Sequence, residues 1–265
     1  MQEFLNRTEP FLGPEGLDAL ASKTIAIAGL GGVGGGAFLA LVRCGCSSFH
    51  LAENGIFDPP DMNRQAAAFG HTMDRPKLDV YLELARSINP DIQIKTWPEG
   101  TQPDNIDDFL QGTDAYVGVI DAEKGAEVKA MSPDLQKRHH VPLFCCAAFG
   151  FGALMINYHP DIMMQDEFDG LVRARSTWGE DLIPSVLASH FNPSVLDRFK
   201  QGVTRGIMST TAIGGLASNA LLANEVLVHL LQGTGVVDRE PVFAPEYATL
   251  DFMNLEMKVH DITQE

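Results

Sequence analysis

Four glycines in one short stretch have the type and spacing to bind a ligand. They follow the apolar run Ile25 to Ala28 and precede an apolar segment at residues 37–42 that can form a helix. The set is Gly29, Gly31, Gly32 and Gly34. In a strand–turn–helix unit, glycines let a phosphate approach backbone N–H groups at the helix N-terminus. The stretch predicts a nucleotide ligand, and by itself it does not distinguish NAD from ATP.

Three charged residues further along the chain suit the other parts of a nucleotide. Glu53 ends a predicted strand at residues 48–52, about 20 residues beyond the turn, where a carboxylate can accept both ribose hydroxyls. Arg64 and Lys77 bracket the following loop. Two cations beside a phosphate turn favour a triphosphate, because they can neutralise the charge that develops on leaving pyrophosphate.

Asp121 is the candidate metal ligand. It directly follows the apolar run A-Y-V-G-V-I at residues 115–120, which reads as a buried strand. A carboxylate where a parallel strand ends is well placed to hold Mg²⁺ on the phosphates of a nucleotide. The predicted catalytic residues are therefore Arg64, Lys77 and Asp121.

These residues require a scaffold in which strands and helices alternate. The predicted strands lie at residues 25–28, 48–52, 92–97, 115–120 and 143–147. The predicted helices between them lie at residues 37–42, 78–88, 102–110 and 127–138. This alternation predicts an α/β fold with a parallel, doubly wound, Rossmann-like sheet. A hairpin strand at 153–158 and strands between 242 and 259 would add antiparallel members.

The chain divides into three predicted segments. Residues 1–22 carry several prolines and glycines and are expected to form an irregular arm that ends in a short helix at 15–20. Residues 23–158 form the nucleotide-binding half. Residues 159–265 complete the same domain with a crossover loop, a packing helix at 209–231 and the final strands. Within them, residues 160–205 are expected to be a lid or crossover loop with short helices, lining the substrate pocket.

Charge and composition exclude several partners. Thirty-five acidic and 19 basic residues give a formal net charge of −16, which repels nucleic acid and anionic membranes. No apolar run reaches the roughly 18 residues of a membrane span, and the first residues lack an export signal. The sequence therefore predicts a cytoplasmic protein that binds neither nucleic acid nor membrane.

The cysteines and histidines give weaker signals. Cys44 and Cys46, like Cys145 and Cys146, lack the C-x-x-C spacing of a structural zinc site and are expected to be buried apolar residues. A catalytic thiol at Cys145 or Cys146 is disfavoured, because reactive thiols need exposure and a cationic setting. The scattered histidines are expected to have structural roles.

The ordered set of motifs resembles the ThiF, MoeB and HesA adenylyltransferases, bacterial relatives of ubiquitin-activating enzymes. The set comprises G-L-G-G-V-G, a strand-end acid, N-R-Q, R-P-K, a strand-end Asp and the V-P-L strand, over roughly residues 7 to 158. The run F-G-F-G-A-L-M-I-N-Y-H-P-D-I-M-M-Q-D-E-F resembles a divergent stand-alone branch of this family.

The resemblance implies a mixed sheet of about eight strands, a homodimer, and ATP-dependent adenylation of a carboxylate. The carboxylate would belong to a small acid, or to the C-terminus of a peptide or ubiquitin-like protein. Carried over by position, the four glycines would cradle phosphate and Glu53 would bind ribose. Arg64, Gln65 and Lys77 would contact phosphates, with Asp121 on Mg²⁺. Arg7 could reach across the dimer to the partner's site.

The sequence also departs from the family pattern. The family usually has Asp at position 53, Asp at 55 and Asn at 61, where this chain has Glu53, Gly55 and Asp61. The D-x-x-D motif of the family aligns with Asp121 and Lys124 of this chain. A lysine ammonium cannot ligate Mg²⁺. Three explanations follow: Asp121 or Glu123 ligates Mg²⁺ after a local shift of the chain, or the protein uses the metal differently, or its activity is reduced or lost.

Three functional hypotheses follow. The first is an adenylyltransferase that forms an acyl-adenylate without cysteine thioester transfer, since no cysteine follows Cys146. The alternative is a non-catalytic nucleotide-binding or scaffold member of the same family. A less favoured hypothesis is an NAD-dependent oxidoreductase, in which Arg64 and Lys77 would have no obvious task.

Overall fold

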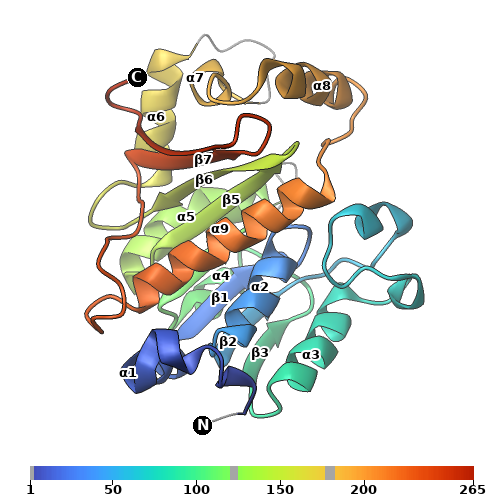
Figure 1. Ribbon diagram of the computed structural model, residues 1–265, viewed down its shortest axis with the longest axis vertical. Coiled ribbons are helices and arrows are strands. Elements are labelled where there is room, and N and C mark those ends of the chain that lie inside the picture. The colour runs from blue at the N-terminus through green and yellow to red at the C-terminus, as the bar shows by residue number, and fades with distance from the viewer. Residues whose placement is uncertain (1–2, 120–124, 177–182) are drawn as a thin grey trace.

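An eight-stranded mixed sheet forms the centre of the protein (Figure 1). The computed structural model describes residues 3–119, 125–176 and 183–265. The strands are β1 (Thr24–Ala28), β2 (Ser48–Ala52), β3 (Gln93–Trp97), β4 (Ala115–Gly118), β5 (Leu143–Phe149), β6 (Gly152–Tyr158), β7 (Glu246–Asp251) and β8 (Glu256–Asp261). Their order is β3-β2-β1-β4-β5-β6-β7-β8. The predicted α/β fold with about eight strands is confirmed.

Helices connect the strands of the first half and cover the sheet. They are α1 (Glu9–Ser22), α2 (Gly34–Arg43), α3 (Lys77–Ile88), α4 (Ile106–Leu110), α5 (Ala126–His139), α6 (Gln165–Arg175), α7 (Ser185–Ala188), α8 (Pro193–Val203) and α9 (Ala212–Leu230). Short 3-10 helices lie at Glu3–Leu5, Pro59–Asn63 and Gly70–Thr72.

Strand direction changes at β6. The pairs β2–β3, β1–β2, β1–β4 and β4–β5 are parallel, whereas β5–β6, β6–β7 and β7–β8 are antiparallel. Parallel neighbours need a long crossover, which the helical segments provide, while two residues suffice between β5 and β6. β1 and β4 lie side by side, yet the chain leaves them in opposite directions along the sheet. Ligands of open α/β sheets bind at such a switch point.

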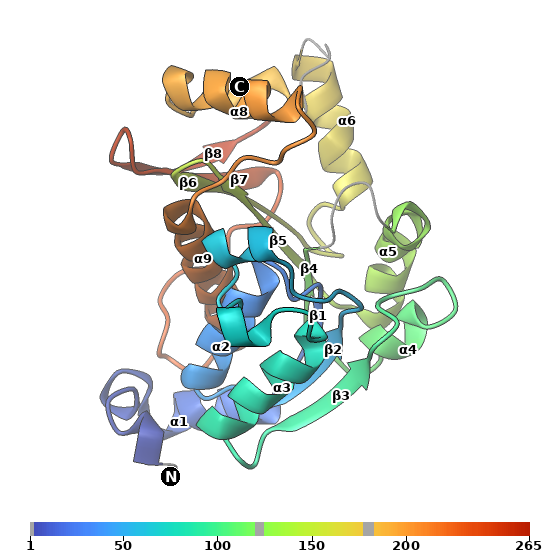
Figure 2. The ribbon, with the colours of Figure 1, turned by 90° about the vertical axis from the view of Figure 1, so that its right-hand side faces the viewer.

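The two faces of the sheet bury separate apolar clusters. Ile25 and Ile27 of β1 pack in a cluster with side chains of α1, α2, α3 and α9. Ala26 and Ala28, which alternate with them, belong to a second cluster with side chains from α4 to α8. Figure 2 shows α2 and α9 on one side of the sheet and α4 and α5 on the other. The continuous apolar sequence of β1 is thus explained by burial on both faces.

Helix α9 is apolar because it is a core helix. By length and composition its 19 residues could cross a membrane, but 67% of its apolar window is buried within the protein. It packs along β5 and β6 and against α2. Gly214, Gly215, Ala217 and Ser218 are buried and allow this close approach. Thr211 caps the helix, its hydroxyl accepting the Gly214 N–H at 3.2 Å.

Two predicted elements need correction. The helix predicted at 15–20 is present, but the residues before it are also helical: α1 begins at Glu9 and has a kink at Gly13 (φ 64°), because Pro10 occupies the first turn, where its missing N–H costs nothing. The helix predicted at 102–110 begins only at Ile106. The Gln102 N–H instead donates to Asn105 Oδ1 at 2.7 Å, a local turn that replaces the first helical turn.

The segment predicted as a crossover with short helices, residues 160–205, contains α6, α7 and α8. These helices lie beyond β6–β8, at the end of the molecule opposite α1 (Figure 1). Phe168 and Phe199 anchor α6 and α8 in the second apolar cluster.

Candidate nucleotide-binding site

Two glycines of the turn are required by the fold itself. Gly29 has a φ of 98°, and a Cβ there would lie 2.9 Å from the Val119 carbonyl oxygen. Its N–H donates to the Ala52 carbonyl at 2.9 Å, which closes the turn against β2. A Cβ on Gly34, the first residue of α2, would lie 2.0 Å from the Gly29 carbonyl oxygen. These positions need glycine whether or not a ligand binds.

Gly31 and Gly32 differ, because no backbone among the described residues crowds them. An ideal Cβ on Gly31 would have Gln65 Nε2, at 4.0 Å, as its nearest neighbour. On Gly32 it would meet only the flexible Arg64 side chain, at 3.1 Å and beyond. Both residues line the same cavity. The space beside Gly31 is therefore open to a ligand, as a phosphate cradle requires, whereas the Arg64 side chain already occupies the space beside Gly32.

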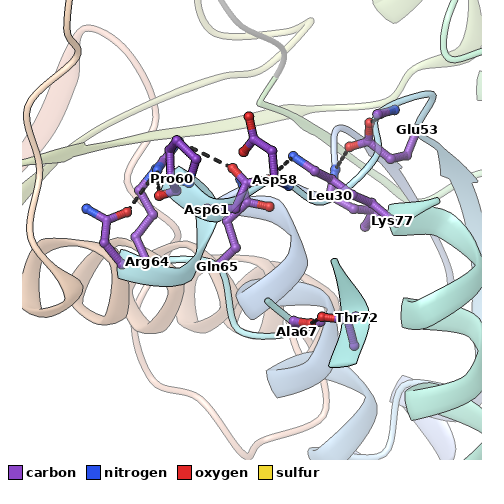
Figure 3. Close-up of polar contacts among 12 residues, drawn as sticks. Leu30, Glu53, Asp58, Pro60, Asp61, Arg64, Gln65, Ala67, Thr72 and Lys77 are labelled. Carbon is purple, nitrogen blue, oxygen red and sulfur yellow. Dashed lines mark hydrogen bonds and ion pairs between the residues drawn. The ribbon is translucent and has the colours of Figure 1, made fainter. Parts of the chain in front are cut away.

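Glu53 presents a fixed carboxylate to this cavity. One carboxylate oxygen accepts the Leu30 N–H at 2.6 Å (Figure 3). The other accepts the Gly55 N–H at 2.6 Å. The first bond ties the end of β2 to the glycine turn. Each oxygen keeps a lone pair for a further donor, such as a ribose hydroxyl.

Asp61 is the centre of the second half of the site. Lys77 Nζ lies 3.0 Å from Asp61 Oδ2, and Arg64 Nη2 lies 3.9 Å from Asp61 Oδ1. Gln65 Nε2 donates a short hydrogen bond to Asp61 Oδ1. Asp61 is only 5% exposed, so this carboxylate is held among three donors (Figure 3). It brings together two cations that are 13 positions apart in the sequence.

Asp61 was not predicted as a site residue. Its signal in the sequence was its place just before N-R-Q, but one acid in a loop does not reveal which cations it will contact. The short helix Pro59–Asn63 positions it, with the Asp58 N–H donating to Asp61 Oδ2 at 3.3 Å.

Arg64 is also held from its own loop. Its Nη1 donates to Asn63 Oδ1 at 2.9 Å and to the Pro60 carbonyl at 3.2 Å. These bonds keep the guanidinium at the cavity wall, beside Gly32.

The cavity has a volume of about 1270 Å³ and contains two chemically different regions. The polar region combines Gly31, Gly32, Glu53, Arg64, Gln65 and Lys77, all predicted site residues. The apolar region is formed by Leu154, Ile156 and Tyr158 of β6 with Phe199 of α8. The cavity thus offers room for a nucleotide and for a second, partly apolar molecule beside it.

Not every predicted residue lies at this cavity. Arg7 is exposed, and neither it nor Gly34 is among the described residues that line the cavity. Asp121, the predicted magnesium ligand, and Lys124 lie outside the described residues.

Cys145 lies on the cavity wall as a protonated thiol. Burial raises its pKa to about 12, and its Sγ donates to the Gly118 carbonyl at 3.1 Å. Burial also raises the pKa of the neighbouring Cys146 thiol. Nucleophilic attack requires the thiolate, which is scarce at neutral pH when the pKa is this high.

The ThiF family profile matches residues 5–265, nearly the whole chain. The chain belongs to the ThiF family. Among curated relatives, the heterocyst HesA of Trichormus variabilis is 34% identical over 105 residues, covering 40% of this chain. The tRNA threonylcarbamoyladenosine dehydratase of Bacillus subtilis is 36% identical over 89 residues, covering 34% of this chain. The chain spans only 39% of that HesA and 35% of that dehydratase.

Solved structures share the fold of this ThiF family member. E. coli MccB, solved with ATP, superimposes with a TM-score of 0.66 at 15% identity, over 99% of this chain and 72% of MccB. The microcin C7 biosynthetic enzyme MccB in complex with N-formylated MccA gives a TM-score of 0.69 at 14% identity, over 99% of this chain and 74% of MccB. At such identities the similarity establishes the fold alone.

Proposed function

We propose that this ThiF family protein binds ATP in the cavity and adenylates a carboxylate, releasing pyrophosphate. The observation that carries the proposal is the convergence of Arg64 and Lys77 on Asp61, at the same cavity that Gly31 and Gly32 line. A binding site for NAD has no need of two cations there, whereas a triphosphate does.

The polar region fits the parts of ATP in order. The Glu53 carboxylate would accept the ribose hydroxyls, because each of its oxygens retains a lone pair. The triphosphate would then run along Gly31 and Gly32 at the N-terminus of α2, where backbone N–H groups and the helix dipole favour negative charge. Arg64 and Lys77 would meet its far end. Gln65, which donates a hydrogen bond to Asp61, would help to hold the Asp61 carboxylate between the two cations.

The proposed reaction places a carboxylate oxygen in line with the α-phosphorus. A new oxygen–phosphorus bond forms, the bond from the α-phosphorus to the bridging oxygen breaks, and the electron pair leaves with pyrophosphate. The products are an acyl-adenylate and pyrophosphate. Lys77 and Arg64 stabilise the charge on the departing pyrophosphate, and the cavity walls orient the two reactants.

Magnesium, when bound, would neutralise phosphate charge and help to orient the triphosphate. Asp121 remains the proposed ligand. It lies outside the described residues, and because Lys124 stands where the family pattern has Asp, Glu123 is the alternative carboxylate ligand.

The carboxylate substrate would enter from the apolar region beside β6. We propose a small acid or the C-terminus of a peptide or ubiquitin-like protein, without transfer to a cysteine. The protonated state of Cys145 supports that last point. We further propose that the protein is a cytoplasmic homodimer. Residues 1–22 would form its N-terminal arm and helix, residues 23–158 its nucleotide-binding half, and residues 159–265 the crossover, packing helix and final strands of the same domain. The −16 net charge excludes nucleic acid and membrane as partners.

A second candidate is a non-catalytic, nucleotide-binding member of the family. It is favoured by Asp61, whose carboxylate already pairs with Lys77 at 3.0 Å and offsets one of the two cationic charges. Such a protein would bind ATP without turning it over.

ATP–pyrophosphate exchange with a panel of carboxylates tests the proposal. The Lys77→Ala variant is expected to lose exchange by about 100-fold or more, the usual effect of removing one group that stabilises transition-state charge. Lys137→Ala, at an exposed site on α5 away from the cavity, is the matched control and should retain full exchange.

Calorimetry with ATP, with and without Mg²⁺, separates the two candidates. ATP binding without exchange for any carboxylate would favour the non-catalytic role. ATP binding that is unchanged by Lys77→Ala would contradict the assignment of the site, and tighter binding of NADH than of ATP would restore the oxidoreductase hypothesis.

A further inference from the structure

A second group of potential ligands lies at the β8 edge of the sheet, away from the glycine turn. It consists of His190, between α7 and α8, His260 on β8, and Glu265, which follows β8. One donor atom from each residue lies within 4.8 Å of the other two. None of the three lines the nucleotide cavity.

The geometry of these atoms is close to that of a metal site. The Glu265 Oε1 atom lies 3.6 Å from His190 Nε2 and 3.7 Å from His260 Nδ1. With metal–ligand bonds of about 2.0 Å, the ligands of a tetrahedral zinc ion are about 3.3 Å apart. Each pair of donor atoms would have to approach by at most about 1.5 Å to surround one ion. The two imidazole rings are stacked, with centroids 3.7 Å and planes 27° apart, and because an ion lies in the plane of each imidazole that binds it, at least one ring must tilt out of the stack on binding.

Each imidazole ring lies within hydrogen-bond distance of one buried side-chain hydroxyl of β7. Thr249 Oγ1 lies 2.8 Å from His260 Nε2. When the hydroxyl accepts from Nε2–H, the Nδ1 lone pair points to Glu265, which is the arrangement typical of a metal-bound histidine. The Tyr247 hydroxyl lies 2.8 Å from His190 Nε2, the same atom that faces Glu265, so an ion bound to this nitrogen would replace that hydrogen bond.

The site is sheltered but reachable. The side chains of His190, His260 and Glu265 are 17%, 9% and 31% exposed. The nearest lysine on β8, Lys258, pairs with Glu256 at 3.0 Å.

We propose that His190, His260 and Glu265 form a binding site for a divalent transition-metal ion of the zinc type. Two neutral imidazoles and one carboxylate are a ligand set that Zn²⁺ uses in proteins. The ion would fasten the loop between α7 and α8 to β8 and to the chain that follows it. It is separate from the magnesium proposed at the nucleotide cavity, and it requires no assumption about adenylation.

Metal titration of the chelator-treated full chain tests the site. Calorimetry with Zn²⁺ should show one ion per chain. Co²⁺ should give the visible absorption of a tetrahedral ion, without the near-ultraviolet charge-transfer band that cysteine ligands produce. Glu265→Gln should weaken Zn²⁺ binding by at least 10-fold, and His260→Gln should weaken it further. His71→Gln, at an exposed histidine outside the cluster, is the control and should leave binding unchanged.

Glu265→Gln keeps the test decisive if a histidine variant does not fold, because Glu265 is the most exposed of the three ligands. Absence of Zn²⁺ uptake by the wild-type chain would overturn the proposal. Uptake that Glu265→Gln leaves unchanged, or a thiolate band with Co²⁺, would place the ion elsewhere and overturn it equally.

Discussion

At the scale of single residues, the glycine turn separates two requirements that look identical in the sequence. Gly29 and Gly34 are glycines because protein backbone occupies the place of a Cβ. Among the described residues, no backbone atom lies within 4 Å of a Cβ built on Gly31, and this residue lines the cavity. Packing explains the first two residues, whereas the third leaves room for a ligand.

This difference predicts opposite behaviour for two alanine variants. Gly31→Ala is expected to leave the melting temperature nearly unchanged and to weaken ATP binding by about 10-fold or more, because the methyl group enters the phosphate cradle. Gly34→Ala is expected to lower the free energy of unfolding by about 3 kcal/mol or more, because its Cβ would overlap the Gly29 carbonyl oxygen. Thermal unfolding and calorimetry with ATP measure both effects. Equal ATP affinity of Gly31→Ala and the wild type would contradict the cradle.

At the scale of elements, a buried carboxylate on α9 fixes the path of the chain into β7. Glu225 is 2% exposed, and its Oε2 accepts Arg239 Nη1 at 3.1 Å and the Val242 N–H at 3.0 Å. A second, short hydrogen bond joins Arg239 Nη2 to Glu225 Oε1. This two-pronged pair ties α9, which packs on β5 and β6, to the segment that leads into the antiparallel half of the sheet.

Arg239→Ala is therefore expected to destabilise the protein, because it leaves the Glu225 charge buried without its cation. Arg239 is 44% exposed, so water can partly replace it, and the expected loss is about 1 to 3 kcal/mol. Urea unfolding measures the change. The double variant Glu225→Gln, Arg239→Ala should recover part of the loss, since the amide carries no charge. A loss below about 0.5 kcal/mol would show that the pair does not hold these elements together.

At the scale of the whole molecule, the proposed dimer would explain Arg7. This residue is exposed and does not line the cavity of its own chain, so any role for it in adenylation would require that it reach a partner's site. Lys77 lines the cavity of its own chain. If each active site combines Lys77 of one chain with Arg7 of the other, two inactive variants can complement each other.

Mixing Arg7→Ala with Lys77→Ala chains, after dissociation and reassembly, should restore about a quarter of wild-type exchange activity, because half of the dimers are mixed and one of their two sites is intact. Each variant alone should stay inactive. Light scattering of the wild type should report a dimer. Activity that fails to return in mixtures verified to contain mixed dimers would mean that Arg7 does not act across an interface.

The sequence by itself determined the fold class, most strand positions and the residues of the polar site. Strong apolar runs such as Ile25 to Ala28, and the glycine spacing after them, are local signals that few other arrangements satisfy. The sequence assigned to one site residues that are far apart along the chain, because the carboxyl ends of parallel strands meet at one edge of a sheet. These residues are Gly31, Glu53, Arg64 and Lys77. The start of α1 was missed because prolines also begin helices.

Only the tertiary structure decided which partners those residues have. Asp61 contacts Lys77 and Arg64 in the folded protein. Likewise His190, His260 and Glu265 come together. Both groupings depend on contacts between distant segments, which no local sequence pattern encodes. A pairing across the fold is set by chain path and side-chain packing, whereas periodicity reports only which face of an element is buried. For the same reason the histidines, expected from the sequence to be structural and scattered, became a candidate site only when the fold brought His190 and His260 together beside Glu265.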